Sequence, residues 1–136
     1  MEVTDACAGD SPQLKNLLSS LYDVEAVTAD SAYLSRRNCD LIEAKGAKPY
    51  IKPKKNITII RSFGSRAWKN MLLNYWNRRD EWNNIYRFRS SAETAFSAIK
   101  RKFGHQLFSI RKDIQRKELM TKVIAYNLNI TAKITI

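Results

Sequence analysis

Residues 24–51, VEAVTADSAYLSRRNCDLIEAKGAKPYI, decide the fold. The segment opens with the apolar run 24–29 (VEAVTA), which is typical of a buried strand. A helical pattern follows and stops before Gly46, a residue type that suits the turn after a helix. Residues 47–51 (AKPYI) are a second strand candidate, although Pro49 prefers an edge or a strand start. Strand, helix and strand in this order predict a parallel α/β sheet.

A carboxylate stands directly after the first of these strands. Asp30 follows residues 24–29 and therefore lies at the carboxyl end of a strand in an α/β sheet. Folds of this class bind their ligands at that edge. Asp30 is therefore a candidate site residue.

The chain before this segment continues the same alternation. Residues 3–6 fit a short strand, and residues 10–12 (DSP) fit a helix start with an N-cap candidate and a proline in the first turn. Leucines spaced i, i+3, i+4 and i+7 then predict one buried stripe: Leu14, Leu17, Leu18 and Leu21. Residues 1–51 should form an α/β part with the order strand, helix, strand, helix, strand.

The chain after this segment should be helical. Residues 52–66 are basic and lack periodicity, which predicts a connection over the surface. Residues 67–136 hold three amphipathic stretches, centred on Trp68–Trp76, Ala92–Phe103 before Gly104, and Leu119–Ile130. We therefore expect a single domain over residues 1–136, with the 1–51 and 67–136 parts joined by the basic connection.

Four polar residues in the run IYRFRSSAETAFSAIKRKFG carry the strongest functional pattern: Tyr86, Arg89, Glu93 and Lys100. On one helix turning about 100° per residue, the four would project within an arc about 60° wide. A lone glutamate flanked by phosphate-binding residue types suits a carboxylate that holds a metal against a nucleic-acid backbone. A solvated basic face is the alternative reading of the same spacing.

The charge is large and unevenly distributed. The chain has a net charge of +11, but residues 1–35 hold one basic and six acidic residues (1 − 6 = −5) and residues 36–136 hold 23 basic and seven acidic ones (23 − 7 = +16). The basic part favours a polyanion, most commonly nucleic acid, with salt-dependent binding. Interleaved aromatic residues could stack bases, but core packing is favoured at this helical spacing: Trp68, Tyr75, Trp76 and Trp82.

Several classes of protein are excluded by composition. No apolar run approaches the 18 or so residues that cross a bilayer, and the N-terminus has no export signal, so we expect a cytoplasmic protein without a membrane partner. Cys7 and Cys39 stand alone, and His105 is the single histidine. Zinc and disulfide scaffolds are therefore not expected, and we interpret the cysteines as reduced and structural and His105 as a surface or capping residue.

These residues resemble a known family, the DDE transposases of prokaryotic insertion sequences, in the IS-four and IS-five-like superfamily with an RNase H-like fold. The spacing of Tyr86, Arg89, Glu93 and Lys100 matches that family's signature position for position. Further matches are the segments ADSAYLSRRN (with Asp30, Tyr33 and Asn38), GAKPYIKPKKN, and the tail around Tyr126 and Asn127. The resemblance covers nearly the whole chain.

The resemblance implies specific roles. Asp30 looks like the second catalytic aspartate and Glu93 like the catalytic glutamate, which together would hold Mg²⁺ or Mn²⁺ for two-metal phosphoryl transfer. Tyr86, Arg89 and Lys100 look like residues that bind DNA phosphates. The partners would be double-stranded DNA of the transposon ends and the target, and the location the cytoplasm of a prokaryote, near the nucleoid.

One part of the family pattern is missing. Members place their first catalytic aspartate on a first strand that bridges the third and fourth, whereas this chain begins at the equivalent of the third strand; we do not expect Asp5 or Asp10 to replace that aspartate. We therefore expect an incomplete RNase H-like domain in which two strands pair and leave exposed edges. It would be a truncated or split transposase, with its two-metal site complete only when an upstream fragment adds the first strands.

Two other functions remain open. A non-catalytic DNA-binding remnant could regulate or inhibit transposition, alone or as a homo-oligomer, and would bind duplex DNA without a divalent metal. A small basic RNA-binding protein is permitted by the charge, although the motif spacing does not favour it.

Overall fold

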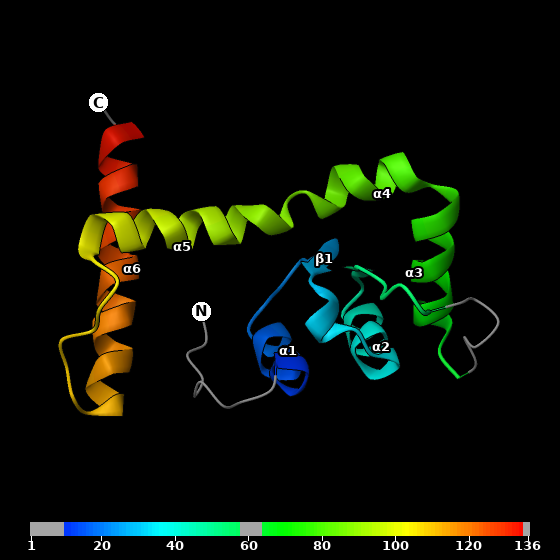
Figure 1. Ribbon diagram of the computed structural model, residues 1–136, viewed down its shortest axis with the longest axis horizontal. Helices are drawn as coiled ribbons and strands as arrows, with labels where there is room; N and C mark the ends of the chain where they lie inside the picture. Colours follow the sequence, from blue (N-terminus) through cyan, green and yellow to red (C-terminus); the bar gives the residue numbers. More distant parts are fainter. Residues whose placement is uncertain (1–9, 58–63, 135–136) are drawn as a thin grey trace. The chain divides into compact units, whose positions relative to one another are not determined.

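The structure, a computed structural model, describes residues 10–57 and 64–134. The chain forms two compact units, Met1–Arg89 and Ser90–Ile136. The class is α/β, mostly helical, with a small parallel sheet (Figure 1). The strand predicted at residues 3–6 lies outside the described residues. Within the described ranges, no helix is both long and apolar enough to cross a membrane.

The elements follow the predicted alternation and then become helical. The first unit contains α1 (Asp10–Ser19), β1 (Ala26–Ala29), the 3₁₀ helix η1 (Ser31–Tyr33), α2 (Arg36–Ala44), β2 (Lys48–Ile51), α3 (Arg66–Asn77) and α4 (Arg79–Tyr86). At the boundary α5 (Arg89–Phe103) begins, and α6 (Lys112–Ile134) completes the second unit. The sequence predicted all of these α-helices except α4, which has no separate periodic signal, and it did not separate η1 from α2.

The two strands pair in parallel, as the strand, helix, strand order predicted. The register runs from Ala26 opposite Lys48 to Ala29 opposite Ile51. In the part of the chain that the structure describes, this pair is the whole sheet, so each strand has one edge without a neighbouring strand. Because the strands are parallel, their carboxyl ends lie at the same end of the sheet, and Asp30 follows β1 there.

Gly46 makes the return from α2 to β2 possible. Its φ is +80°, in the left-handed region that favours glycine. The N–H of Gly46 donates to the carbonyl of Glu43 at 2.9 Å, and the N–H of Ala47 donates to the carbonyl of Ile42 at 3.2 Å. This pair of bonds is a Schellman motif, so the glycine ends α2 as its sequence position predicted.

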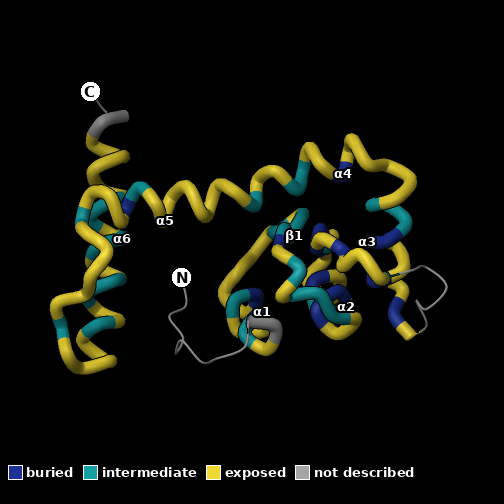
Figure 2. The backbone as a smooth tube through the Cα atoms, in the orientation of Figure 1, coloured by how far each residue is buried: buried dark blue, intermediate teal, exposed yellow. Residues whose placement is uncertain are grey.

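The core of the first unit lies among α1, α2, α3 and the strands (Figure 2). Ile42, Ile51 and Leu72 are fully buried at its centre. Cys39 is also fully buried, with its Sγ 3.9 Å from Met71 Sδ, and burial, with the nearby charge of Asp40, raises the pKa of its thiol to about 12. A thiol held protonated in this way packs as a small apolar group, which agrees with the structural role expected for it.

The apolar stripes differ from the predicted ones at their ends. Leu14 and Leu18 are buried, but Leu21 lies beyond the end of α1 and is 44% exposed, so the predicted stripe is wrong at its last member. Trp68 and Trp82 are buried, as core packing predicted, and Tyr75 is half-buried, but Trp76 is 40% exposed, so the prediction is wrong for Trp76. The basic connection keeps Lys52, Lys54 and Lys55 exposed, whereas Pro53 between them is buried.

The second unit is held together by few buried side chains. Among the described residues of this unit, Ile99 of α5 is the one that is buried, and 6% of the Ile99 surface is exposed. Glu118 of α6 organises the loop between the two helices: its carboxylate accepts the N–H groups of Phe108 and Ser109 at 3.0 Å each and the Ser109 hydroxyl at 2.8 Å. Lys122 lies 3.5 Å from the same carboxylate and donates to the carbonyl of Gln106 at 2.8 Å.

These bonds make the loop sensitive to acid. The Phe108 N–H, together with Ser109 and Lys122, lowers the pKa of Glu118 from 4.5 to about 2. A carboxyl group whose pKa is lower in the folded state stabilises that state above its unfolded pKa, and the stabilisation is lost as the pH falls towards the folded pKa. Protonation between pH 4.5 and 2 should therefore release the loop.

We predict that Glu118→Gln abolishes the protection of this loop at neutral pH, because the amide lacks the charge that holds two backbone N–H groups. Amide hydrogen exchange at Phe108 and Ser109 measures the effect. In the unmodified chain the protection should persist at pH 5 and disappear as the pH approaches 2. Protection that is unchanged in the variant, or lost already at pH 5, would contradict this assignment.

Candidate functional site

Asp30 lies at the carboxyl end of β1, where its position in the sequence placed it. It caps η1, and its Oδ1 accepts the N–H of Ala32 at 2.8 Å. This bond fixes the orientation of the carboxylate, while the residue remains exposed. No described residue donates a hydrogen bond to Oδ2. One oxygen of an oriented carboxylate is therefore open to a ligand.

The same edge of the sheet is basic. Because Ala29 pairs with Ile51, the chain leaves β2 at Lys52 on the edge where it leaves β1 at Asp30. Lys52, Lys54 and Lys55 are exposed. Positive charge therefore follows β2 in the chain, and Lys52 lies at the end of the sheet where Asp30 follows β1.

The expected arc of four residues does not lie on a single helix. Tyr86 is the last residue of α4, and α5 begins at Arg89. Between them the N–H of Arg87 donates to the carbonyl of Asn83, four residues before it. The N–H of Phe88 donates to the carbonyl of Ile85, only three residues before it, and this tighter turn ends α4. The assumption of one continuous helix is therefore wrong for Tyr86.

The other three residues share a face of α5. At about 100° per residue, Arg89, Glu93 and Lys100 project within an arc about 40° wide. Glu93 and Lys100 are exposed, and Arg89 is half-buried. Arg89, Glu93 and Lys100 therefore share one side of α5, as the spacing predicted for these three residues, while Tyr86 lies outside this helix.

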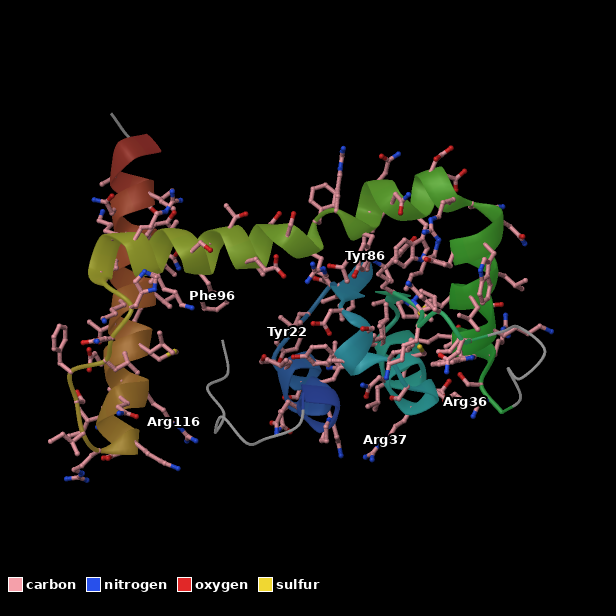
Figure 3. The ribbon with its side chains drawn as sticks, viewed as in Figure 1. Tyr22, Arg36, Arg37, Tyr86, Phe96 and Arg116 are labelled. Atoms are coloured by element: carbon pink, nitrogen blue, oxygen red, sulfur yellow. The ribbon has the colours of Figure 1, made fainter. Side chains whose placement is uncertain are left out.

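Tyr86 is held by an aromatic cluster in the first unit. Its ring stacks on Trp82 with centroids 4.5 Å apart and planes 26° apart. Trp82, only 2% exposed, also meets the rings of Tyr75 of α3 at 4.9 Å and Tyr50 of β2 at 5.9 Å. Figure 3 shows Tyr86 on the side of α4 that faces the strands. The cluster thus fixes Tyr86 relative to β2.

Arginines extend the aromatic cluster at its surface. The guanidinium of Arg89 lies 5.8 Å from the centroid of the Tyr86 ring, and that of Arg79 lies 3.8 Å from the centroid of the Tyr75 ring. A guanidinium over an aromatic ring makes a cation–π interaction, in which the ring attracts the positive charge. Through Trp82 and Tyr86, the first cation of the motif is linked to the sheet.

The candidate residues are divided between the two units. Asp30, Tyr86 and Arg89 belong to the first, and Glu93 and Lys100 belong to the second. Among residues 10–57 and 64–134, no group of three or more His, Cys, Asp or Glu side chains is arranged to hold a metal ion. The convergence of Asp30 and Glu93 on a cation stays a prediction.

Comparison with known protein families gives one match, a family model described as "Transposase DDE domain", over residues 1–128. The chain belongs to the DDE transposase family. No curated protein and no solved structure matches the chain. Transposases of this family move DNA segments, so the match assigns the chain to DNA transposition and agrees with the resemblance found in its motifs.

Trp82 is a residue of this transposase domain whose role the motifs did not reveal. It stands four residues before Tyr86, on the same face of α4, and that spacing was the available signal. Its buried Nε1 has no hydrogen-bond partner among the described atoms, so the ring contributes through packing alone. Trp82 is a positioning residue for Tyr86 and Arg89.

We predict that Trp82→Ala lowers the free energy of unfolding by about 3–5 kcal/mol, the usual cost of deleting a buried aromatic side chain. Trp76→Ala is the matched control: Trp76 is 40% exposed, so its loss should cost about 1 kcal/mol or less. Urea unfolding followed by circular dichroism measures both. Equal costs for the two variants would show that the cluster does not anchor α4.

Proposed function

We propose that this transposase domain takes part in metal-dependent phosphoryl transfer on DNA, the strand cleavage and joining of transposition, with Asp30 and Glu93 as metal-binding carboxylates. The observation that carries the proposal is the position of Asp30. It ends a strand of a parallel pair with an exposed, oriented carboxylate that has an open oxygen, in a chain that matches a DDE domain over residues 1–128.

The residues present fit a hard divalent cation. Carboxylate oxygens are the ligands that Mg²⁺ and Mn²⁺ prefer, and Mg²⁺ typically binds through one or two carboxylates together with waters and substrate phosphates. Asp30 has an oriented carboxylate, and Glu93 is exposed on α5. When bound, such an ion would activate the attacking oxygen or stabilise the leaving oxygen of an in-line transfer.

The cations of the motif would bind the DNA backbone. The guanidinium of Arg89 lies 5.8 Å from the Tyr86 ring centroid, and Lys100 lies on the same face of α5 as Glu93; a guanidinium and an ammonium are both groups that bind phosphate. Positive charge at this point would neutralise the phosphates that the metal site must approach. The Tyr86 hydroxyl would add a neutral hydrogen bond to the same backbone.

An RNase H-like sheet is part of this proposal. The parallel pairing of β1 and β2, connected by α2, is consistent with the fourth and fifth strands of that fold. We propose that a further polypeptide segment supplies the strand bearing the first aspartate next to β1, whose outer edge has no strand among the described residues. Residues 1–136 would then bind DNA alone but cleave it only with that segment.

A second candidate function is DNA binding without catalysis. It is favoured by the charge of the second unit, where residues 90–136 hold nine basic and three acidic residues (9 − 3 = +6). Among these acids, Asp113 pairs with Arg111, and Glu118 is held by the loop and Lys122. A remnant of this kind would occupy transposon ends and inhibit complete transposase.

Complementation with Mg²⁺ tests the catalytic proposal. We expect residues 1–136, mixed with an upstream fragment that carries the first strands of a family member and with that member's transposon-end duplex, to produce strand cleavage on a sequencing gel. Asp30→Asn and Glu93→Gln should each reduce cleavage by about 1,000-fold or more, because each removes a charged metal ligand. Both changes conserve side-chain size.

The control is Asp23→Asn, which removes an exposed carboxylate from the same unit and should leave cleavage unchanged. If no complementation mixture cleaves the duplex but the chain still binds it, the non-catalytic function would replace the catalytic proposal. Cleavage that survives Asp30→Asn or Glu93→Gln would overturn the assignment of that residue.

A further inference from the structure

The second unit contains a shallow, open groove that the DDE residues do not use. It has a volume of about 330 Å³ and lies where α5 and α6 approach each other. Its walls are Ala98, Arg101 and Lys102 of α5 and Tyr126, Asn129 and Ile130 of α6. Each helix thus contributes residues at i, i+3 and i+4, which is one continuous face.

The polar groups of the groove are available to a ligand. No hydrogen bond or ion pair with another described residue engages the side chains of Arg101, Tyr126 or Asn129. The Nζ of Lys102 lies over the face of Phe103, 5.8 Å from the ring centroid. Two cations, a hydroxyl and an amide therefore line one hollow.

The acidic side chains nearest to this groove along its two helices are Glu93 and Glu118. On α5, Glu93 is five residues before Ala98, or about 8 Å along the helix axis, and projects about 130° away from the centre of Ala98, Arg101 and Lys102. On α6 the nearest one is Glu118, eight residues before Tyr126, or about 12 Å along the helix axis at 1.5 Å per residue. Its charge is already neutralised by two backbone N–H groups and Lys122. The field in the groove is therefore positive and selects for an anion.

The groove faces away from the motif residues. Around α5, at about 100° per residue, the centre of Ala98, Arg101 and Lys102 lies about 150° from the arc of Arg89, Glu93 and Lys100. A helix with its side chains is about 10–12 Å across. An anion in the groove therefore cannot be the phosphate that Glu93 and Lys100 would approach.

We propose that this α5–α6 groove binds a backbone phosphate of duplex DNA at a second point, apart from the metal site. The inference rests on the proposed DNA-binding function and adds a contact that supplies affinity but no chemistry. Arg101 can bind two phosphate oxygens at once, Lys102 adds a point charge, and Asn129 and Tyr126 supply neutral donors. Ala98 and Ile130 form an apolar floor on which the adjoining deoxyribose can rest.

The test compares two pairs of charge changes. Arg101→Gln with Lys102→Gln should weaken binding to a 30-base-pair duplex by about tenfold at 100 mM salt and reduce the slope of log K against log salt by about 1. Arg116→Gln with Lys117→Gln removes the same charge from exposed positions on α6, away from the groove (Figure 3), and should change affinity less than threefold. Fluorescence anisotropy over a salt series measures both.

A pair of substitutions at uncharged residues distinguishes specific binding in the groove from general electrostatic attraction. Asn129→Ala should weaken binding by a factor of about three to five with the salt slope unchanged, whereas Asn127→Ala, an exposed asparagine on another face of α6, should have no effect. Circular dichroism of all four variants should match that of the unmodified chain, since the changed residues are exposed.

The outcomes distinguish the two proposals. If duplex binding falls equally in both double variants and Asn129→Ala has no effect, the groove proposal would be overturned and the proposed function would stand. No binding of the unmodified chain to duplex DNA would overturn both. Tighter binding to a folded RNA than to the duplex, lost on changing Arg101 and Lys102, would overturn the assignment of the anion to DNA.

Discussion

The packing of Trp82 is the constraint on which the first unit's candidate site depends. Its ring stacks on Tyr86, meets Tyr75 nearly edge-on and contacts Tyr50, so one buried side chain joins α4, α3 and β2. A buried tryptophan removes about 150–250 Å² from water, worth about 4–6 kcal/mol at about 25 cal/mol per Å². Because β2 pairs with β1 in fixed register, the same contacts set Tyr86 and Arg89 relative to the strand that ends at Asp30.

The second unit depends on charge and backbone hydrogen bonds more than on a core. Ile99 is its buried side chain among the described residues, and the carboxylate of Glu118 compensates by holding the loop before α6. Lys100, Arg101 and Lys102 of α5 remain exposed, on two sides of that helix. Such a positively charged unit suits a negatively charged ligand, and DNA is the ligand that transposases generally bind.

The sequence predicted the elements of this fold better than their ends and contacts. The hydrophobic pattern and the position of Gly46 were sufficient to predict β1, α2 and β2. A buried strand and a left-handed glycine each leave a local signal in the sequence. The break between α4 and α5 was missed, since the run from Tyr86 to Lys100 contains no proline or glycine and the turn at Arg87 and Phe88 leaves no such signal in the sequence. Asp30 was found from its place after a strand. Trp82 was recognised only as a core residue, because its role depends on partners from β2 and α3 that no local pattern specifies.

The central claim is that Asp30 and Glu93 hold one cation. Paramagnetic relaxation by Mn²⁺ in an NMR spectrum of the chain, mixed with an upstream fragment bearing the first strands, tests it most directly. Substoichiometric Mn²⁺ should broaden the amide signals of residues 28–32 and 91–95 together, and Asp30→Asn should remove both effects, because the carboxylates share the ion. Broadening confined to one of these segments, or persisting at residues 91–95 in the Asp30→Asn variant, would contradict the claim.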